Sequence, residues 1–310
     1  MIPDIINQNI LKTLLYYDIF KHPLKKDEIF TFSPKNNVTK SEIFKVVDDL
    51  SGNDISKFSQ KDGYIYIKPN VDYIENRLKK EEYSAKMWKI VRYVVHIIKR
   101  FPFVRAIMVT GSLSKNSSSK ESDLDFMVIT KKNRLWITRT LLMLFKKIFL
   151  FNSYKYFCIN YFITEDSMEI EDKNIFTATE VATVKSVYNT EMIKKFLESN
   201  KWVNDFFPNY NCCDPVLHTA GYKVNDRSSY IQKLIELVFA GRAGDCINRI
   251  FKNVYLRHWL KKYSDMNAEV RDRRFRSTDN VAKTHPEDMQ SFILDKYREK
   301  LSQFNLQFNV

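Results

Sequence analysis

The sequence predicts an α+β protein with a small helical unit at its start, a mixed β-sheet in its middle and a helical region at its end. The chain has 310 residues, which is more than one hydrophobic core usually serves. Apolar residues recur at helical spacing near both ends, and short apolar runs bounded by turn residues lie between them. We therefore expect three domains, at residues 1–70, 71–185 and 186–310.

The composition is that of a globular, positively charged protein. Hydrophobic residues make up 44% of the chain and aromatic residues 14%, which is enough for buried cores and excludes a disordered chain. The net charge of +13 attracts phosphates, whether on nucleotides, nucleic acid or anionic lipid. No uncharged apolar run reaches the roughly 18 residues that a membrane span needs, and residues 1–8 lack the pattern of a signal peptide. We expect a cytoplasmic protein without a membrane partner.

The first 70 residues predict three helices followed by a hairpin. His22-Pro23 ends the first helix because proline lacks an amide donor and restricts the residue before it, and Thr39 with Glu42 forms a capping box for the third. An Asp-Gly turn at residues 62–63 joins two short strands. The expected elements are helices at 10–20, 26–30 and 39–50 and strands at 55–58 and 64–67. This is the element order of a winged helix.

The charges on the third helix of this unit indicate that it does not recognise DNA. It carries Lys40 and Lys45 but also the acidic Glu42, Asp48 and Asp49, whereas a helix that enters the major groove normally presents a basic or amide-rich face. We expect the unit to pack against the rest of the chain or to form a homo-oligomer.

Strands and helices alternate through the middle of the chain, and helices follow. Phe101-Pro102 ends a long charged helix, and an amphipathic helix separates the second predicted strand from the third. The expected elements of the middle part are a helix at 71–100, strands at 104–110 and 124–130, a helix at 133–149, and strands at 156–164 and 168–170. The remainder predicts helices alone, at 177–184, 191–206, 228–240, 245–263 and 286–303.

The segment between the first two predicted strands of the core carries the chemistry. Gly111-Ser112 follows the first strand, and Asp123 and Asp125 alternate at the start of the second. The two-residue period of a strand places both carboxylates on one face, where they repel each other unless a cation lies between them. The pair therefore predicts a hard metal ion, Mg²⁺ or Mn²⁺. Gly111 permits close backbone approach, and Ser112 can cap a short helix whose N-terminus binds phosphate.

This segment resembles the signature of the polymerase-beta-like nucleotidyltransferases, in which a Gly-Ser turn precedes Asp-x-Asp on the next strand. The similarity extends to Phe103-Val104-Arg105, to Arg134-Leu135-Trp136 and to the segment 200–209, which together look like an uncharacterised bacterial branch of that superfamily. The resemblance implies a nucleotidyltransferase core between the winged helix and the helical domain.

The resemblance also implies a reaction. Members of the superfamily move a nucleoside monophosphate from an NTP or dNTP to a hydroxyl and release pyrophosphate, and some relatives make nucleotide signals in anti-phage defence. Carried over to this chain, it places the metal on Asp123 and Asp125 and the nucleotide at Gly111, Ser112 and Ser122. Nucleic acid ends, nucleotides, protein hydroxyls and small molecules all stay open as acceptors, and the charge of +13 favours an oligonucleotide product.

A departure from the family pattern concerns the third carboxylate, which in this superfamily comes from a later strand and helps to deprotonate the attacking hydroxyl. The polar position of the candidate strand is Asn160, and an amide cannot take that proton. Either Asn160 is a site residue of a two-carboxylate variant, or Glu165, Asp166 or Glu169 reaches the site instead. The alternative function is a catalytically weak protein of this fold that binds nucleotide as a regulator.

Two groups of cations are further candidates. Arg134 and Arg139, on the helix after the Asp strand, can reach a triphosphate or form part of a solvated helix face. From Arg242 to Arg276, ten Lys and Arg stand against four Asp and Glu, with aromatic residues between them, a mixture that suits a groove for single-stranded nucleic acid. The expected contributors are Arg249, Lys252, Arg257, Lys261 and Arg271 to Arg276. The helical spacing of the aromatic residues favours core packing for most of them.

Overall fold

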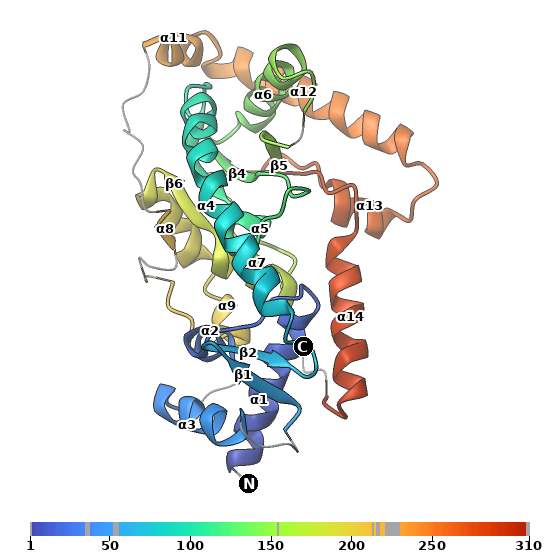
Figure 1. Ribbon diagram of the computed structural model, residues 1–310. Coiled ribbons are helices and arrows are strands. Elements are labelled where there is room, and N and C mark those ends of the chain that lie inside the picture. Colours follow the sequence, from blue (N-terminus) through green and yellow to red (C-terminus); the bar gives the residue numbers. More distant parts are fainter. Residues whose placement is uncertain are drawn as a thin grey trace.

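The computed structural model describes residues 2–34, 38–51, 56–153, 155–212, 214, 218–220 and 230–307. Ile55 of the first predicted hairpin strand and residues 228–229 of a predicted helix lie outside these ranges. Within them the chain combines helices with a mixed sheet, so the predicted α+β class is confirmed. Figure 1 shows the N-terminal elements at one end of the molecule and the sheet with its helices above them.

The N-terminal elements have the predicted order of three helices and a hairpin. They are α1 (Ile2–Asp18), α2 (Lys26–Phe32), α3 (Lys40–Ser51), β1 (Phe58–Lys61) and β2 (Tyr64–Ile67). Ile10, Leu15 and Val47 are among the residues of their shared core. The strands pair antiparallel about the turn at Asp62 and Gly63, both of which have a positive φ, as a tight Asp-Gly hairpin turn requires.

A five-stranded mixed sheet forms the centre of the described chain. Its strands are β3 (Val104–Val109), β4 (Asp125–Thr130), β5 (Cys158–Thr164), β6 (Lys185–Tyr188) and β7 (Val281–Lys283). They lie in the order β6-β3-β4-β5-β7, with β4 and β5 parallel and the other pairs antiparallel. Because β4 and β5 are parallel, they begin at the same edge of the sheet, and Asp125 pairs with Cys158 there.

Helices cover both faces of this sheet. Those nearest to it are α4 (Tyr73–Ile98), α6 (Leu135–Phe149), α7 (Ile175–Thr183), α8 (Thr190–Ser199) and α9 (Val203–Phe206). Alternate residues of β4 divide between two cores. Phe126 and Val128 share a core with α4 and α6, whereas Met127 and Ile129 share one with α7 and α8. Asp125 lies two residues before Met127 in the strand, so its side chain points to the same face of the sheet, toward α7.

The C-terminal helices return the chain to its start. They are α11 (Tyr230–Val238), α12 (Gly241–Lys262), α13 (Ala268–Phe275) and α14 (Met289–Gln303). In Figure 1, α12 lies beside α6 at one end of the molecule, and α14 runs back toward the N-terminal elements. Tyr297 donates from its hydroxyl to the Lys12 carbonyl at 3.2 Å, and Lys300 pairs with Asp18 at 2.6 Å. The first and last helices therefore pack as neighbours.

The sequence predicted helices alone after residue 177, and this is wrong. β6 and β7 form the two edges of the central sheet, and β7 has only three residues, too few for alternation to be recognised. The predicted helix at 191–206 is divided into α8 and α9. The division occurs at Asn200, whose amide donates to the carbonyls of Met168 and Phe196 at 2.9 and 2.8 Å. The short helix α13 was also not predicted.

The strand predicted at 168–170 is wrong as well. These residues form an extended loop, although Met168 and Ile170 are buried in the core as their apolar character indicates. The Ile170 amide donates to Asn200 Oδ1 at 2.8 Å. The Ile170 amide therefore donates to the side chain of Asn200, where the sequence predicted a hydrogen bond to a neighbouring strand.

Candidate functional site

A cavity of about 1300 Å³ opens where β4 and β5 begin. Asp123 and Asp125 line it together with Asn160, Gly111 and Ser112. Its other walls come from α6, α7, α12 and the segment around β7. Residues that the motif predicted to act together therefore do lie around one space.

Gly111 is packed against the Asp125 carboxylate. Its φ of +66° lies in the left-handed region, and a Cβ built on it would lie 2.5 Å from Asp125 Oδ2. A side chain at this position would be strained by the backbone angle and again by the contact. Gly111 begins the short helix α5 (Gly111–Ser114), and its amide donates to Glu180 Oε2 at 3.3 Å. The Gly-Ser turn is thereby fixed against the Asp strand.

The electrostatic state of Asp125 reflects this crowded position. The pKa of Asp125 is raised to about 7, chiefly by burial and also by the negative charges of Glu180 and Asp123. A hydrogen bond from the Cys158 thiol and the charge of Lys115 act in the opposite direction. A cation beside the two aspartates would favour their ionised forms.

The donor set of the site fits a hard divalent cation. Asp123 and Asp125 supply carboxylate oxygens at the wall of a cavity that also has room for phosphate and water. Mg²⁺ is commonly bound by one or two carboxylates together with waters and substrate phosphates. Among the described residues, no group of three or more Asp, Glu, His or Cys side chains is arranged around a metal position. The fit therefore depends on the two aspartates.

Asn160 reaches the site through an irregularity in the sheet. Phe126 pairs with Ile159, but Met127 pairs with Tyr161, so that Asn160 is the extra residue between the two pairs. Bulges of this kind bend a strand and redirect its side chains. Asn160 Nδ2 donates to Asp125 Oδ1 at 2.9 Å. Asn160 is thus a direct neighbour of a predicted metal ligand, which agrees with one of the two alternatives that the sequence left open.

The three carboxylates that were alternatives to Asn160 do not line the cavity. Each lies within ion-pair distance of a cation outside it. The pairs are Glu165 with Arg105 at 4.0 Å, Asp166 with Lys132 at 2.9 Å and Glu169 with Lys173 at 2.6 Å. The structure therefore does not support a role for them in the site.

Glu180 is a site residue that the sequence analysis missed. It lies on α7, lines the cavity and pairs with Lys115 at 2.7 Å. Lys115 Nζ also donates to the Gly111 carbonyl at 3.2 Å. Glu180 and Lys115 therefore hold both the amide and the carbonyl of Gly111. Only the fold could reveal this role, because Glu180 is 69 residues from Gly111 and is an ordinary helical glutamate in its local sequence.

Buried cations line the cavity from α6. Arg139 and Lys146 are 4% and 2% exposed. Arg139 donates to Thr284 Oγ1 at 2.9 Å and lies over the Tyr255 ring at 4.1 Å. Burial lowers the pKa of Lys146, whereas the negative charge of Asp123 is among the influences that raise it. Arg139 was predicted, but Lys146 was missed because a lysine near a helix end is usually exposed.

Two predicted nucleotide contacts lie elsewhere. Ser122 Oγ accepts a hydrogen bond from the Ser119 amide at 3.0 Å and shapes the loop before Asp123. Arg134 is buried, pairs with Asp245 and donates to the Gly241 carbonyl at 3.1 Å. Neither Ser122 nor Arg134 lines the cavity, so the structure does not support these two predictions. Arg134 instead fixes the start of α12 to the core.

The basic stretch from Arg242 to Arg276 is not an open groove of available cations. Several of its predicted contributors are ion-paired. The pairs are Lys252 with Asp279, Arg273 with Asp288, and Arg276 with Glu171, Asp172 and Asp272. The rings of Trp259, Tyr263 and Phe275 stack on one another with centroids 4.4 to 5.9 Å apart. The predicted core packing is seen for Phe251 and Tyr255, which pack against the core shared by α4 and α6. Trp259 and Tyr263 also line the cavity.

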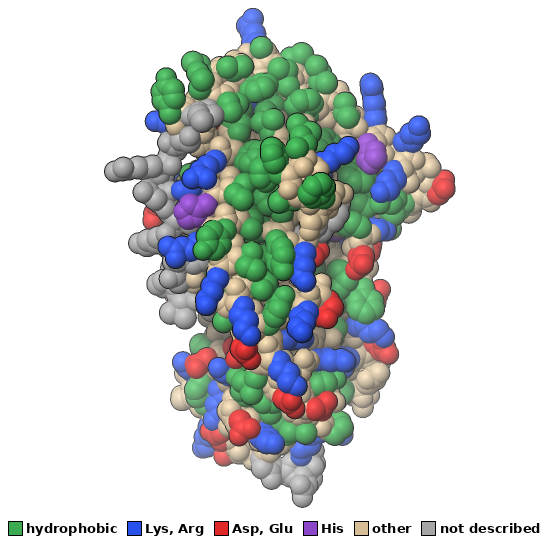
Figure 2. Space-filling model, turned by 45° about the horizontal axis from the view of Figure 1, so that its top comes forward, with side chains coloured by type: hydrophobic (Ala, Val, Ile, Leu, Met, Phe, Trp, Pro, Cys, Tyr) green, Lys and Arg blue, Asp and Glu red, His purple; other side chains and the backbone are tan. Residues whose placement is uncertain are grey.

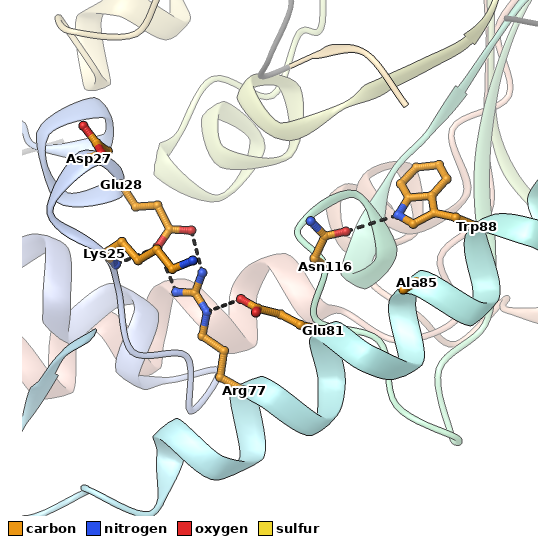
Figure 3. A pocket seen from close by; sticks show the side chains of 8 residues that line it. All are labelled: Lys25, Asp27, Glu28, Arg77, Glu81, Ala85, Trp88 and Asn116. Carbon is orange, nitrogen blue, oxygen red and sulfur yellow. Dashed lines mark hydrogen bonds and ion pairs between the residues drawn. The ribbon is translucent and has the colours of Figure 1, made fainter. Parts of the chain in front are cut away.

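A smaller cavity of about 410 Å³ lies between α2 and α4. Figure 3 shows Arg77 reaching between Glu28 and Glu81. Its guanidinium makes two hydrogen bonds of 2.8 Å to Glu28 and one of 2.8 Å to Glu81. Because two carboxylates already hold this cation, we interpret it as a joint between the N-terminal unit and α4 and not as an anion site.

Comparison of the chain with protein-family models, with curated proteins and with solved structures finds no match.

We expect Asp125→Asn to stabilise the metal-free protein above pH 7 and to have little effect near pH 4. An aspartate in the unfolded chain ionises near pH 4, whereas burial raises the pKa of Asp125 to about 7. As the pH rises between these values, only the unfolded wild type loses the proton, so the wild type loses stability that the amide variant keeps. Urea unfolding in EDTA should show a difference of about 4 kcal/mol above the higher pKa. A difference independent of pH would contradict this assignment.

Proposed function

We propose that the chain is a metal-dependent nucleotidyltransferase, which moves a nucleoside monophosphate from an NTP or dNTP to a hydroxyl and releases pyrophosphate. The observation that carries the proposal is the contact between the Gly111 turn and the Asp125 carboxylate at the wall of the large cavity. This contact joins the two halves of the Gly-Ser and Asp-x-Asp signature. On this proposal the sheet is the catalytic core and the N-terminal elements are a winged helix.

The surroundings of the carboxylates suit a triphosphate. Lys115, Arg139 and Lys146 bring positive charge to the cavity, and such charge stabilises both the bound phosphates and the departing pyrophosphate. Ser112 Oγ lies 3.1 Å from Ser118 Oγ, which holds the Ser112 hydroxyl at the start of α5. Tyr255, on the α12 wall, carries the Arg139 guanidinium over its ring at 4.1 Å and so helps to hold this cation at the cavity.

Asp123 and Asp125 are the residues that would hold Mg²⁺ or Mn²⁺. Such an ion, when bound, neutralises phosphate charge and lowers the pKa of a hydroxyl that is to attack. Asn160 orients Asp125 through its amide, and Glu180 fixes the Gly111 turn together with its ion-pair partner. The role of these two residues in the proposed reaction is therefore to keep the phosphate-binding turn and the carboxylates in a constant geometry.

Incubation with each NTP and dNTP tests the proposal. The expected result is pyrophosphate release with transfer of the labelled monophosphate, dependent on Mg²⁺ or Mn²⁺ and stopped by EDTA. Nucleotide binding without release would favour the regulatory alternative, which is consistent with the amide of Asn160 beside Asp125. Neither binding nor release with any nucleotide would reject both functions.

We expect Asn160→Asp to raise the affinity for Mg²⁺ by about tenfold, because a third carboxylate adds charge beside Asp125. The same charge should lower the stability of the metal-free protein, since it repels Asp125. Thermal unfolding at increasing Mg²⁺ concentration measures both effects. Asn152→Asp is the matched control, because Asn152 lines the cavity but is exposed. Equal effects of the two substitutions would place Asn160 outside the metal site.

A further inference from the structure

Exposed apolar side chains gather at the end of the molecule formed by α6, α11 and α12. We call this surface the apolar end. Its most exposed members are Phe149 at the end of α6 and Phe151 just after it, Tyr230, Leu237 and Val238 on α11, and Ile250 and Val254 on α12. Figure 2, which brings this end forward, shows hydrophobic side chains over much of its surface with Lys and Arg among them.

The exposure of these side chains is too large and too concentrated for ordinary surface residues. Phe151 is 92% exposed, Leu237 71% and Val238 70%. Single exposed apolar residues are normal on soluble proteins, but a group drawn from three adjacent elements marks a surface that binds something.

The charges on this surface have one sign. Lys233, Arg249, Arg257 and Lys261 are exposed on α11 and α12. The acidic residues of α11 and α12 are directed to internal partners. They are Glu236, which accepts from Arg105 and from the Phe103 amide, and Asp245, which pairs with Arg134. The outward side therefore offers apolar groups and cations together.

We propose that the apolar end docks on an anionic lipid surface. Apolar side chains of a surface helix enter the boundary between headgroups and acyl chains, and neighbouring cations bind the lipid phosphates. No helix within the described ranges is long and apolar enough to cross a bilayer, so α11 and α12 would lie along the surface. The proposal revises the expectation that the chain has no membrane partner, and it does not depend on nucleotidyl transfer.

The chemistry of the surface favours lipid over the other occupants. A second copy joined by a two-fold contact would bring like charges together, because each copy presents the same cations. A nucleic acid strand requires a series of aromatic faces for stacking. Phe149, Phe151 and Tyr230 offer such faces, but Leu237, Val238, Ile250 and Val254, which form the exposed apolar face of α11 and α12, are aliphatic. The aromatic residues Tyr255 and Trp259 of α12 face the cavity instead.

Sedimentation of the full chain with vesicles tests the proposal. We expect binding to phosphatidylcholine vesicles that contain phosphatidylglycerol, decreasing with salt, and little binding to phosphatidylcholine alone. Leu237→Asp with Val254→Asp, and separately Arg249→Glu with Arg257→Glu, should each weaken binding at least about tenfold. Lys195→Glu with Lys201→Glu is the control for charge, because these exposed residues lie on α8 and just after it, away from the apolar end (Figure 1).

Several results would overturn the proposal. One is the absence of binding to the anionic vesicles by folded wild-type protein, with folding checked by circular dichroism. Another is equal binding by the wild type and by both folded double variants. A concentration-dependent dimer that the Leu237→Asp, Val254→Asp variant abolishes would assign the surface to a second copy. Oligonucleotide binding that the arginine reversals remove, without vesicle binding, would assign it to nucleic acid.

Discussion

Replacing Asp125 or Asp123 with alanine should lower the rate of nucleotidyl transfer at least about thousandfold while the fold stays intact. Both carboxylates line the cavity beside the Gly111 turn, and no other acidic cluster in the described chain is arranged to hold a metal in their place. Loss of the metal removes several kcal/mol of charge stabilisation from the transition state. Neither substitution should destabilise the metal-free protein through charge, because each removes one of two repelling carboxylates. Above pH 7, Asp125→Ala should also gain the stability expected for Asp125→Asn, because the buried charge is gone.

The rate of pyrophosphate release and the temperature of unfolding measure the two parts of this prediction. Glu121→Ala is the matched control, since Glu121 is exposed two residues before Asp123 and does not line the cavity. The control should keep wild-type activity and its response to Mg²⁺. An Asp123→Ala protein with wild-type activity would remove the proposed metal ligands from the mechanism, even if transfer itself were established.

The parts of the site that the sequence predicted are those fixed by local geometry. The alternation of a strand places Asp125 on the side of Met127, and Asp123, which lies just before β4, also reaches the cavity. The positive φ of Gly111 is the kind of backbone that only glycine adopts easily. Asn160 was recognisable as the polar residue in an apolar strand, although the bulge that carries it was not.

The parts that the sequence did not predict depend on contacts between distant segments. Glu180 and Lys146 become site residues only when α7 and α6 are placed around β4. Counting charges between Arg242 and Arg276 predicted a basic groove, but composition cannot show that Arg276 is paired with Glu171 and Asp172, which lie 105 and 104 residues away along the chain. The strand β7 was missed for the same reason, because its three residues are held by pairing with β5.

Gly111→Ala should lower the rate of transfer at least about a hundredfold and destabilise the protein by about 2–4 kcal/mol. The φ of +66° costs an alanine about 1–2 kcal/mol. The new Cβ would also lie 2.5 Å from Asp125 Oδ2, so either the turn or the carboxylate must shift. Each shift disturbs the geometry on which the proposed phosphate and metal positions depend, and a displacement of this kind has a large effect on rate.

Gly63→Ala separates the cost of the backbone angle from the cost of the contact with Asp125. Gly63 has a φ of +78° in the hairpin turn, but a Cβ there would have nothing within 4 Å, so this variant should lose only the backbone contribution and keep its activity. A second comparison uses Gly111→Ala together with Asp125→Ala, because the three atoms nearest to the new Cβ all belong to Asp125. If the contact is the cause, the double variant should be more stable than the sum of the single effects by about 1 kcal/mol. Two results would contradict this. One is a double variant whose loss of stability equals the sum of the single losses, and the other is an equal loss of stability for Gly63→Ala and Gly111→Ala. Either would show that Gly111 is needed only for the backbone angle of the turn and does not hold the turn against the carboxylate.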